Sequence, residues 1–146
     1  MKISARARYG LSALICIACQ YNTSGLLAVA QLSENLGISK IYLEQTFSIL
    51  KLAGLVSSEK GSQGGYRLSR PPSEISIYEI LSAVDTALAE KTKETVTDKP
   101  IEFAMQRSVF AMIDQTLQAL LSDISLEDLV IETNKAKTED GYMYHI

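Results

Sequence analysis

Apolar residues recur at helical spacing near the start of the chain. From residue 11 to residue 19 they are separated by three, one, three and one positions, a pattern that places them on one face of a helix. Ser4 can cap this helix, and we expect it to end near Tyr21, before the turn-forming residues 22–25. The predicted inner face consists of Leu11, Leu14, Ile15, Ala18 and Cys19.

Two further helices follow, with a short turn between them. Gly37 ends the first, and Ser39 can cap the second, which we expect over residues 40–53 before Gly54 stops it. The predicted inner positions are Val29, Ala30, Leu32 and Leu36 in the first helix and Leu43, Phe47, Leu50 and Ala53 in the second.

A short hairpin and a fourth helix complete the first half. Two β-prone segments, 55–59 and 66–68, flank the glycine-rich turn 60–65, which predicts an antiparallel hairpin. A helix over 76–86 follows, with Ile77, Ile80, Leu81 and Val84 on one face. The predicted fold is mainly α with a small β-hairpin wing, a winged helix-turn-helix, followed by a long dimerisation helix.

The second half has a different pattern. We expect a polar linker and then a long helix over 100–121, whose apolar stripe favours a dimer seam over a ligand groove. Ser125 and Asp128 approximate a capping box for a last helix to residue 133, followed by a polar tail. The predicted domains are a DNA-binding domain (1–85), a linker (86–100) and a dimerisation helix with a C-terminal helix and tail (101–146).

Charge divides the chain in the same place. Residues 1–70 carry eight basic and three acidic groups, whereas the remaining residues carry six basic and fourteen acidic ones. Although the net charge is −3, a basic half of this kind fits a nucleic-acid footprint. Random drift in charge between the halves is the alternative.

The apolar run near the N-terminus also resembles a short export signal. It is far shorter than the ~18 apolar residues of a membrane span, and its residues fit the apolar face of the first predicted helix. Two cysteines are too few for a secreted disulfide framework. We therefore expect a cytoplasmic protein that does not bind a membrane.

The order of helix, helix, tight turn, helix and hairpin predicts binding to double-stranded DNA. In such a motif the second helix of the turn meets base edges, and a basic hairpin can lie on phosphates or in the minor groove. Gln suits adenine, Glu can accept from cytosine, and Lys suits phosphate. The predicted DNA-binding residues are Arg6, Ser39, Lys40, Tyr42, Glu44, Gln45, Lys60, Ser62, Gln63 and Arg67.

Other functions fit less well. A polar surface helix and a solvated β-turn are the plain alternatives for the two elements taken singly. The glycine-rich turn is not a nucleotide-phosphate loop, because no helix start and no Gly-Lys-Ser/Thr ending follow it. With one histidine, His145, in the tail and no apparent catalytic set, we expect no enzyme activity and no metal site.

Several segments together resemble one bacterial family of winged helix-turn-helix regulators, which includes IscR, NsrR and CymR. The segments are SARARYGL at 4–11, GIS and YLEQ at 37–39 and 42–45, AGLVSS at 53–58, GGYRL and RPP at 64–68 and 70–72, and SLEDL at 125–129. The resemblance implies a homodimer on a roughly palindromic operator, acting as a repressor, with the long helix crossing its partner. Lys60 stands where several members place Arg, so the sequence preference of the wing can differ.

The same resemblance bears on cofactors and partners. Iron–sulfur members place three cysteines between the fourth helix and the long helix, and residues 86–106 contain none, so we expect no cluster. The last five residues, YMYHI, resemble the end of the cysteine-metabolism repressor, which suggests a cysteine-synthesis enzyme as a protein partner. The alternative function is an effector- or enzyme-binding adaptor with the same fold and weak DNA binding.

Cys16 and Cys19 form the other candidate site. They lie at i and i+3 of the first predicted helix, among its apolar residues. Free cysteines are commonly buried as small apolar side chains, which is the expectation here. The alternative is a redox-sensing pair.

Overall fold

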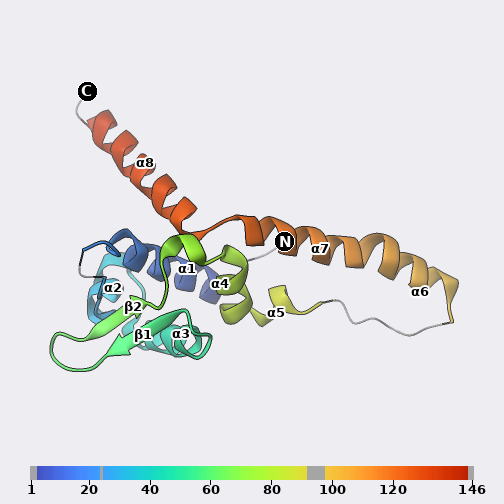
Figure 1. Ribbon diagram of the computed structural model, residues 1–146, viewed down its shortest axis with the longest axis horizontal. Helices are drawn as coiled ribbons and strands as arrows, with labels where there is room; N and C mark the ends of the chain where they lie inside the picture. The colour runs from blue at the N-terminus through green and yellow to red at the C-terminus, as the bar shows by residue number, and fades with distance from the viewer. Residues whose placement is uncertain (1–2, 24, 92–97, 145–146) are drawn as a thin grey trace.

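The computed structural model describes residues 3–23, 25–91 and 98–144, with side chains described as far as residue 139. It contains a small winged helix-turn-helix unit from which two helices project in different directions (Figure 1). The elements are α1 (Ala5–Cys19), α2 (Val29–Leu36), α3 (Lys40–Leu52), β1 (Val56–Glu59), β2 (Gly65–Leu68), the 3₁₀ turn η1 (Pro72–Glu74), α4 (Ile77–Val84), α5 (Thr86–Ala89), α6 (Pro100–Met105), the π-helical η2 (Gln106–Phe110), α7 (Ala111–Asp123) and α8 (Leu126–Tyr144).

Local signals in the sequence set most helix ends. The Ser4 hydroxyl accepts a hydrogen bond from the Ala7 N–H (3.1 Å), and the Ser39 hydroxyl accepts one from the Tyr42 N–H (3.2 Å). Both contacts satisfy backbone donors that a helix start leaves unpaired. The expected caps of α1 and α3 are therefore confirmed.

The buried face of α1 differs from the expected one. Leu11, Ile15 and Cys19 are only half-buried, and the helix is turned toward smaller residues. A side chain at Gly10 would come within 3.3 Å of both Thr46 on α3 and Val84 on α4. Small residues let three helices approach closely, and the periodicity of large apolar residues does not show this. The buried residues are Ala7, Gly10, Ala13, Leu14, Ile17 and Ala18.

The buried faces of the next two helices also depart from expectation at single positions. Of the four inner positions predicted in α2, only Leu32 is buried, and Ala30 is exposed. In α3, Leu43, Phe47 and Leu50 are buried as expected, but Thr46 is buried and Ala53, the C-cap residue, is exposed. The helix therefore ends one residue earlier than the pattern suggested. The four predicted inner positions of α4 are all buried.

The hairpin is attached to the helical core through β2. The strands pair antiparallel, with Val56 opposite Leu68. Tyr66 exchanges two backbone hydrogen bonds with Leu27 (2.8 and 3.0 Å), and its ring stacks on that of Phe47 at 4.4 Å. These contacts fix the hairpin beside α3.

The second half is more helical than the sequence suggested. Part of the expected linker forms α5, while residues 92–97 lie outside the described part of the chain. The expected long helix is continuous from Pro100 to Asp123 and contains a π-helical turn. The capping box is confirmed by the hydrogen bond from the Ser125 N–H to Asp128 (2.9 Å), but α8 continues to Tyr144 instead of ending near residue 133.

That difference has a physical reason. Beyond its first turns α8 projects into solvent (Figure 1) and its described side chains are mostly exposed and polar, so no apolar period marks it. Within the described residues, no helix combines the length and apolar character needed to cross a membrane.

Candidate nucleic-acid interface

The turn between α2 and α3 fixes the direction of α3. Gly37 adopts a left-handed conformation (φ 65°), which glycine tolerates without strain. The Ser33 hydroxyl donates to the Ile38 carbonyl (2.6 Å) and ties the turn back to α2. With Leu43, Phe47 and Leu50 buried beneath it, α3 presents its opposite face to solvent.

The predicted DNA-binding residues of α3 lie on that outer face. Lys40 and Glu44 are one turn apart, and their charged atoms are 4.0 Å from each other with both side chains more than half exposed. Such a pair is weak and leaves Lys40 available to a phosphate. The exposed members of the predicted set are Ser39, Lys40, Glu44 and Gln45.

Tyr42 connects this face to the start of α1. Its half-buried ring packs edge-on against Tyr9 at 5.5 Å. Arg6 is exposed and precedes Tyr9 by one helical turn, so it lies on the same side of α1. The structure therefore brings Arg6 toward the first turn of α3, although the two are far apart in sequence.

The side chains at the tip of the wing are exposed, whereas Arg67 at its base is held in an ion pair. Lys60, Ser62 and Gln63 are all exposed in the turn between the strands. Arg67 is half-buried, and its guanidinium contacts Glu59 at 2.7 Å. Its Nε atom is buried without a partner. A DNA contact by Arg67 stays a prediction, and it would require this ion pair to open.

One lysine that the sequence pattern left without a role ties the wing to α3. The Lys51 ammonium donates to the Ser58 hydroxyl at 2.7 Å, which joins the last turn of α3 to β1. The wing and α3 therefore form one surface. A period in the sequence cannot reveal such a contact, because it depends on how the hairpin packs.

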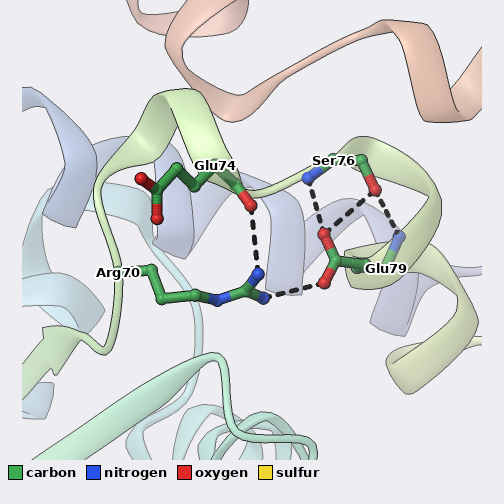
Figure 2. Close-up of polar contacts among 4 residues, drawn as sticks. All are labelled: Arg70, Glu74, Ser76 and Glu79. Atoms are coloured by element: carbon green, nitrogen blue, oxygen red, sulfur yellow. Dashed lines mark hydrogen bonds and ion pairs between the residues drawn. The ribbon is translucent and has the colours of Figure 1, made fainter.

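Arg70 makes a second connection, between the wing and α4 (Figure 2). Its guanidinium donates to the Glu74 carbonyl (3.1 Å) and to the Glu79 carboxylate (2.8 Å). The other oxygen of Glu79 accepts from the Ser76 N–H (2.9 Å), while the Glu79 N–H donates to the Ser76 hydroxyl (3.2 Å). This is a capping box at the start of α4, held from the wing side by an arginine.

The charge of Glu79 is stabilised by these contacts. Burial alone would raise the pKa of Glu79, but the hydrogen bond from the Ser76 N–H and the contact with Arg70 outweigh burial and lower the pKa below its ordinary value of 4.5. The charged form therefore stabilises the fold above that value, and this contribution is lost as the pH falls through the lowered pKa.

Replacing Glu79 by Gln tests this contribution. Because the pair is partly exposed, we expect a loss of under about 1 kcal/mol in the free energy of unfolding at pH 7. The difference from the unmodified protein should shrink as the pH falls through the lowered pKa of Glu79. Urea unfolding at pH 7 and at a series of lower pH values measures it. Glu74→Gln is the matched control, since Arg70 uses only the backbone of Glu74; an equal loss in both variants would refute the assignment.

The two cysteines are free and half-buried, less covered than expected. Burial raises the pKa of the Cys16 thiol, the neighbouring Cys19 raises it further, and Lys137 of α8 lowers it. A raised pKa favours the thiol over the reactive thiolate at neutral pH. A redox role for the pair stays a prediction.

Three features together define the class of the protein: the helix-turn-helix, the exposed outer face of α3 and the attached wing. The protein is a winged helix-turn-helix DNA-binding regulator. The chain matches the Rrf2 family, described as iron-dependent transcriptional regulators, over residues 3–132. It belongs to the Rrf2 family.

Individual relatives agree with this assignment. The HTH-type transcriptional regulator IscR of Aliivibrio salmonicida is 33% identical over 96% of this chain and 83% of its own length. Among solved structures, CymR, the global cysteine regulator of B. subtilis, is 30% identical with a TM-score of 0.76, covering 90% of this chain and 98% of CymR. T. potens IscR is 28% identical with the same TM-score, covering 99% and 96%. The predicted family, fold class and DNA-binding function are confirmed.

The cysteines of this chain do not fit the ligand set of an iron–sulfur cluster. Such clusters are held by several thiolates, and the chain has two cysteines, both on α1. Cys16 and Cys19 sit one turn apart and are both half-buried. The described residues contain no group of three or more acidic, histidine or cysteine side chains placed to hold a metal.

Proposed function

We propose that this regulator is a homodimeric repressor that binds a roughly palindromic operator through α3, the start of α1 and the tip of the wing. The observation that carries the proposal is that Arg6, Lys40, Gln45, Lys60 and Gln63 are all exposed, on elements joined by side-chain contacts of α3 with α1 and with β1. The basic groups of this set suit phosphates, and its polar groups suit base edges. A cytoplasmic site of action follows from the DNA target.

Fluorescence anisotropy with the DNA upstream of the protein's own gene tests the proposal. We expect salt-sensitive binding at least ~10³-fold tighter than to random DNA of equal length. Repression is tested with the same DNA driving a reporter gene, which should become less active when the regulator is expressed. Binding without preference over random DNA would favour the alternative function, an effector- or enzyme-binding adaptor.

The long helix supplies the dimer surface in this proposal. It projects from the DNA-binding unit (Figure 1), and the residues that share its apolar face remain largely exposed in one chain. An exposed apolar stripe at helical spacing is typical of an interface between subunits. The stripe consists of Val109, Met112, Ile113, Thr116, Leu117 and Leu120, which together line a groove.

Replacing Ile113 by Asp is expected to break the dimer. Ile113 is 58% exposed in the single chain, so the change should leave each subunit folded while placing a charge in the interface. Sedimentation equilibrium should show the mass halved, and operator binding should weaken by ~10-fold or more because two half-sites no longer bind together. Gln115→Asp, on the opposite side of α7, is the control and should remain dimeric. A dimeric Ile113→Asp protein would refute this interface.

Two further features of the proposal rest on the sequence. We propose that the regulator works without an iron–sulfur cluster, because its cysteines do not fit one. A cysteine-synthesis enzyme as partner rests on the likeness of residues 142–146 to the end of the cysteine-metabolism repressor. The last two of these residues, and the side chains of the others, lie outside what the structure describes.

A further inference from the structure

In the first turns of α3, the outer face carries one large apolar side chain among polar ones. Ile41, to which the sequence pattern gave no contact, is 70% exposed in the first turn of the helix. At about 100° per residue, Ile41 lies roughly 170° from the mean direction of the four buried residues of α3. It therefore faces away from the core, on the same side as Glu44, Gln45 and Ser48, which are all exposed.

The fold gives no reason for an isoleucine at this position. Its side chain is outside the core, and a β-branched residue is a weaker helix former than the alanine or glutamate that would serve on a solvated face. The chemistry of the major groove does give a reason. Beside its hydrogen-bonding groups, the major groove presents the thymine 5-methyl, an apolar group that an aliphatic side chain can cover.

We propose that Ile41 is a specificity-determining residue that packs against the 5-methyl group of a thymine in each operator half-site. Gln45 follows one turn later on the same face, about 6 Å along the helix axis, and its amide suits adenine. With base pairs about 3.4 Å apart, the two side chains reach positions within about two base pairs of each other. The half-site accordingly contains a thymine within two positions of an adenine. The inference rests on the proposed function, because it requires α3 to enter the major groove.

The size of the effect follows from the buried methyl group. An isoleucine in a helix is held close to one χ1 rotamer, so packing against the base costs little side-chain entropy. Removing one methyl from such a contact is expected to weaken binding by roughly four- to tenfold.

The experiment uses the full-length protein and DNA enriched by it from a random pool. Each thymine in the enriched site is replaced in turn by deoxyuridine, which removes only the 5-methyl group, and affinity is measured by competition. We expect one symmetry-related pair of thymines at which the replacement weakens binding by roughly four- to tenfold. In Ile41→Ala the same replacement should cost less than about twofold, since the partner of the methyl is gone.

Leu52→Ala is the matched control. Leu52 is 91% exposed on the same helix but at its far end, so it is equally free of the core and away from the first turns. This variant should keep both the affinity and the deoxyuridine penalty of the unmodified protein. Unfolding curves of the two variants should match, because neither side chain is buried.

The outcomes separate this inference from the function on which it rests. Tolerance of deoxyuridine at every position, or an equal penalty in Ile41→Ala, would overturn the role of Ile41 while specific binding of the enriched DNA upheld the proposed interface. Failure to enrich any sequence would overturn both.

Discussion

Reversing two charges, Lys40→Glu together with Lys60→Glu, is expected to weaken operator binding by ~100-fold or more at physiological salt. Lys40 stands at the start of α3 and Lys60 at the wing tip, and both are exposed. Each substitution removes an attraction to phosphate and adds a repulsion. The slope of log affinity against log salt should also fall, by about one for each phosphate that the protein no longer neutralises. Anisotropy titrations over a range of salt concentrations measure both effects.

Lys135→Glu provides the control for net charge. Lys135 is exposed on α8, which projects on the side of the molecule away from α3 and the wing (Figure 1). Affinity in this variant should change by less than about threefold, because Lys135 lies on a helix that extends away from the interface and salt screens exposed charges. If the double variant bound the operator as tightly as the unmodified protein, Lys40 and Lys60 would lie outside the DNA contact and the assigned interface would be wrong.

Replacing Gly65 by Ala should strongly destabilise the attachment of the wing to the helical core. A methyl group there would overlap the backbone carbonyl of Leu27 and lie 2.9 Å from the Ala28 nitrogen. These are backbone atoms, so β2 would have to move away and break the two hydrogen bonds between Leu27 and Tyr66. We expect a loss of about 3–4 kcal/mol in the free energy of unfolding, measured by urea denaturation.

Gly54→Ala separates steric overlap from backbone strain. Gly54 has φ 76°, but a methyl group there meets no atom within 4 Å. This variant should lose only about 1–2 kcal/mol, from the left-handed conformation alone. A Gly65→Ala protein no less stable than Gly54→Ala would show that β2 can shift without loss of its attachment.

The parts of the fold that sequence analysis predicted are those with local causes. The start of α3 depends on Ser39, and its approach depends on Gly37; both signals lie within a few residues of the structure they produce. The hairpin was predicted for the same reason, since strands and turn are adjacent in the chain. Its attachment through Leu27 was not visible, because it joins residues far apart in sequence.

The differences between the predicted and observed buried faces of the helices show what the spacing of apolar residues can predict. A period of large apolar residues predicts which face is buried only if large residues fill the interface. In α1 the small residue Gly10 faces Thr46 and Val84 of the neighbouring helices, so the buried face was misplaced. Residues 134–139 of α8 are all exposed and mostly polar, so their helical state gave no apolar period.

The candidate site divides along similar lines. Residue types suited to DNA could be chosen from the sequence, as with Lys40 and Gln45, because the order of elements indicated which turns face the groove. The contacts that side chains make with one another inside the protein could not be predicted from the sequence. The ion pair between Arg67 and Glu59 depends on the register of two strands, and the contact of Tyr9 with Tyr42 depends on how α1 crosses α3.

The projection of the C-terminal helices away from the wing has a kinetic consequence. Residues 100–144 carry eight acidic and three basic groups, and Figure 1 shows α7 and α8 extending from the unit that holds α3 and the hairpin. In the field of a DNA duplex this separation of charge exerts a torque that turns the wing toward the phosphates and the long helices away. Encounters in other orientations are repelled. At low salt the protein therefore approaches DNA mainly with α3 and the wing facing it, before any base contact forms.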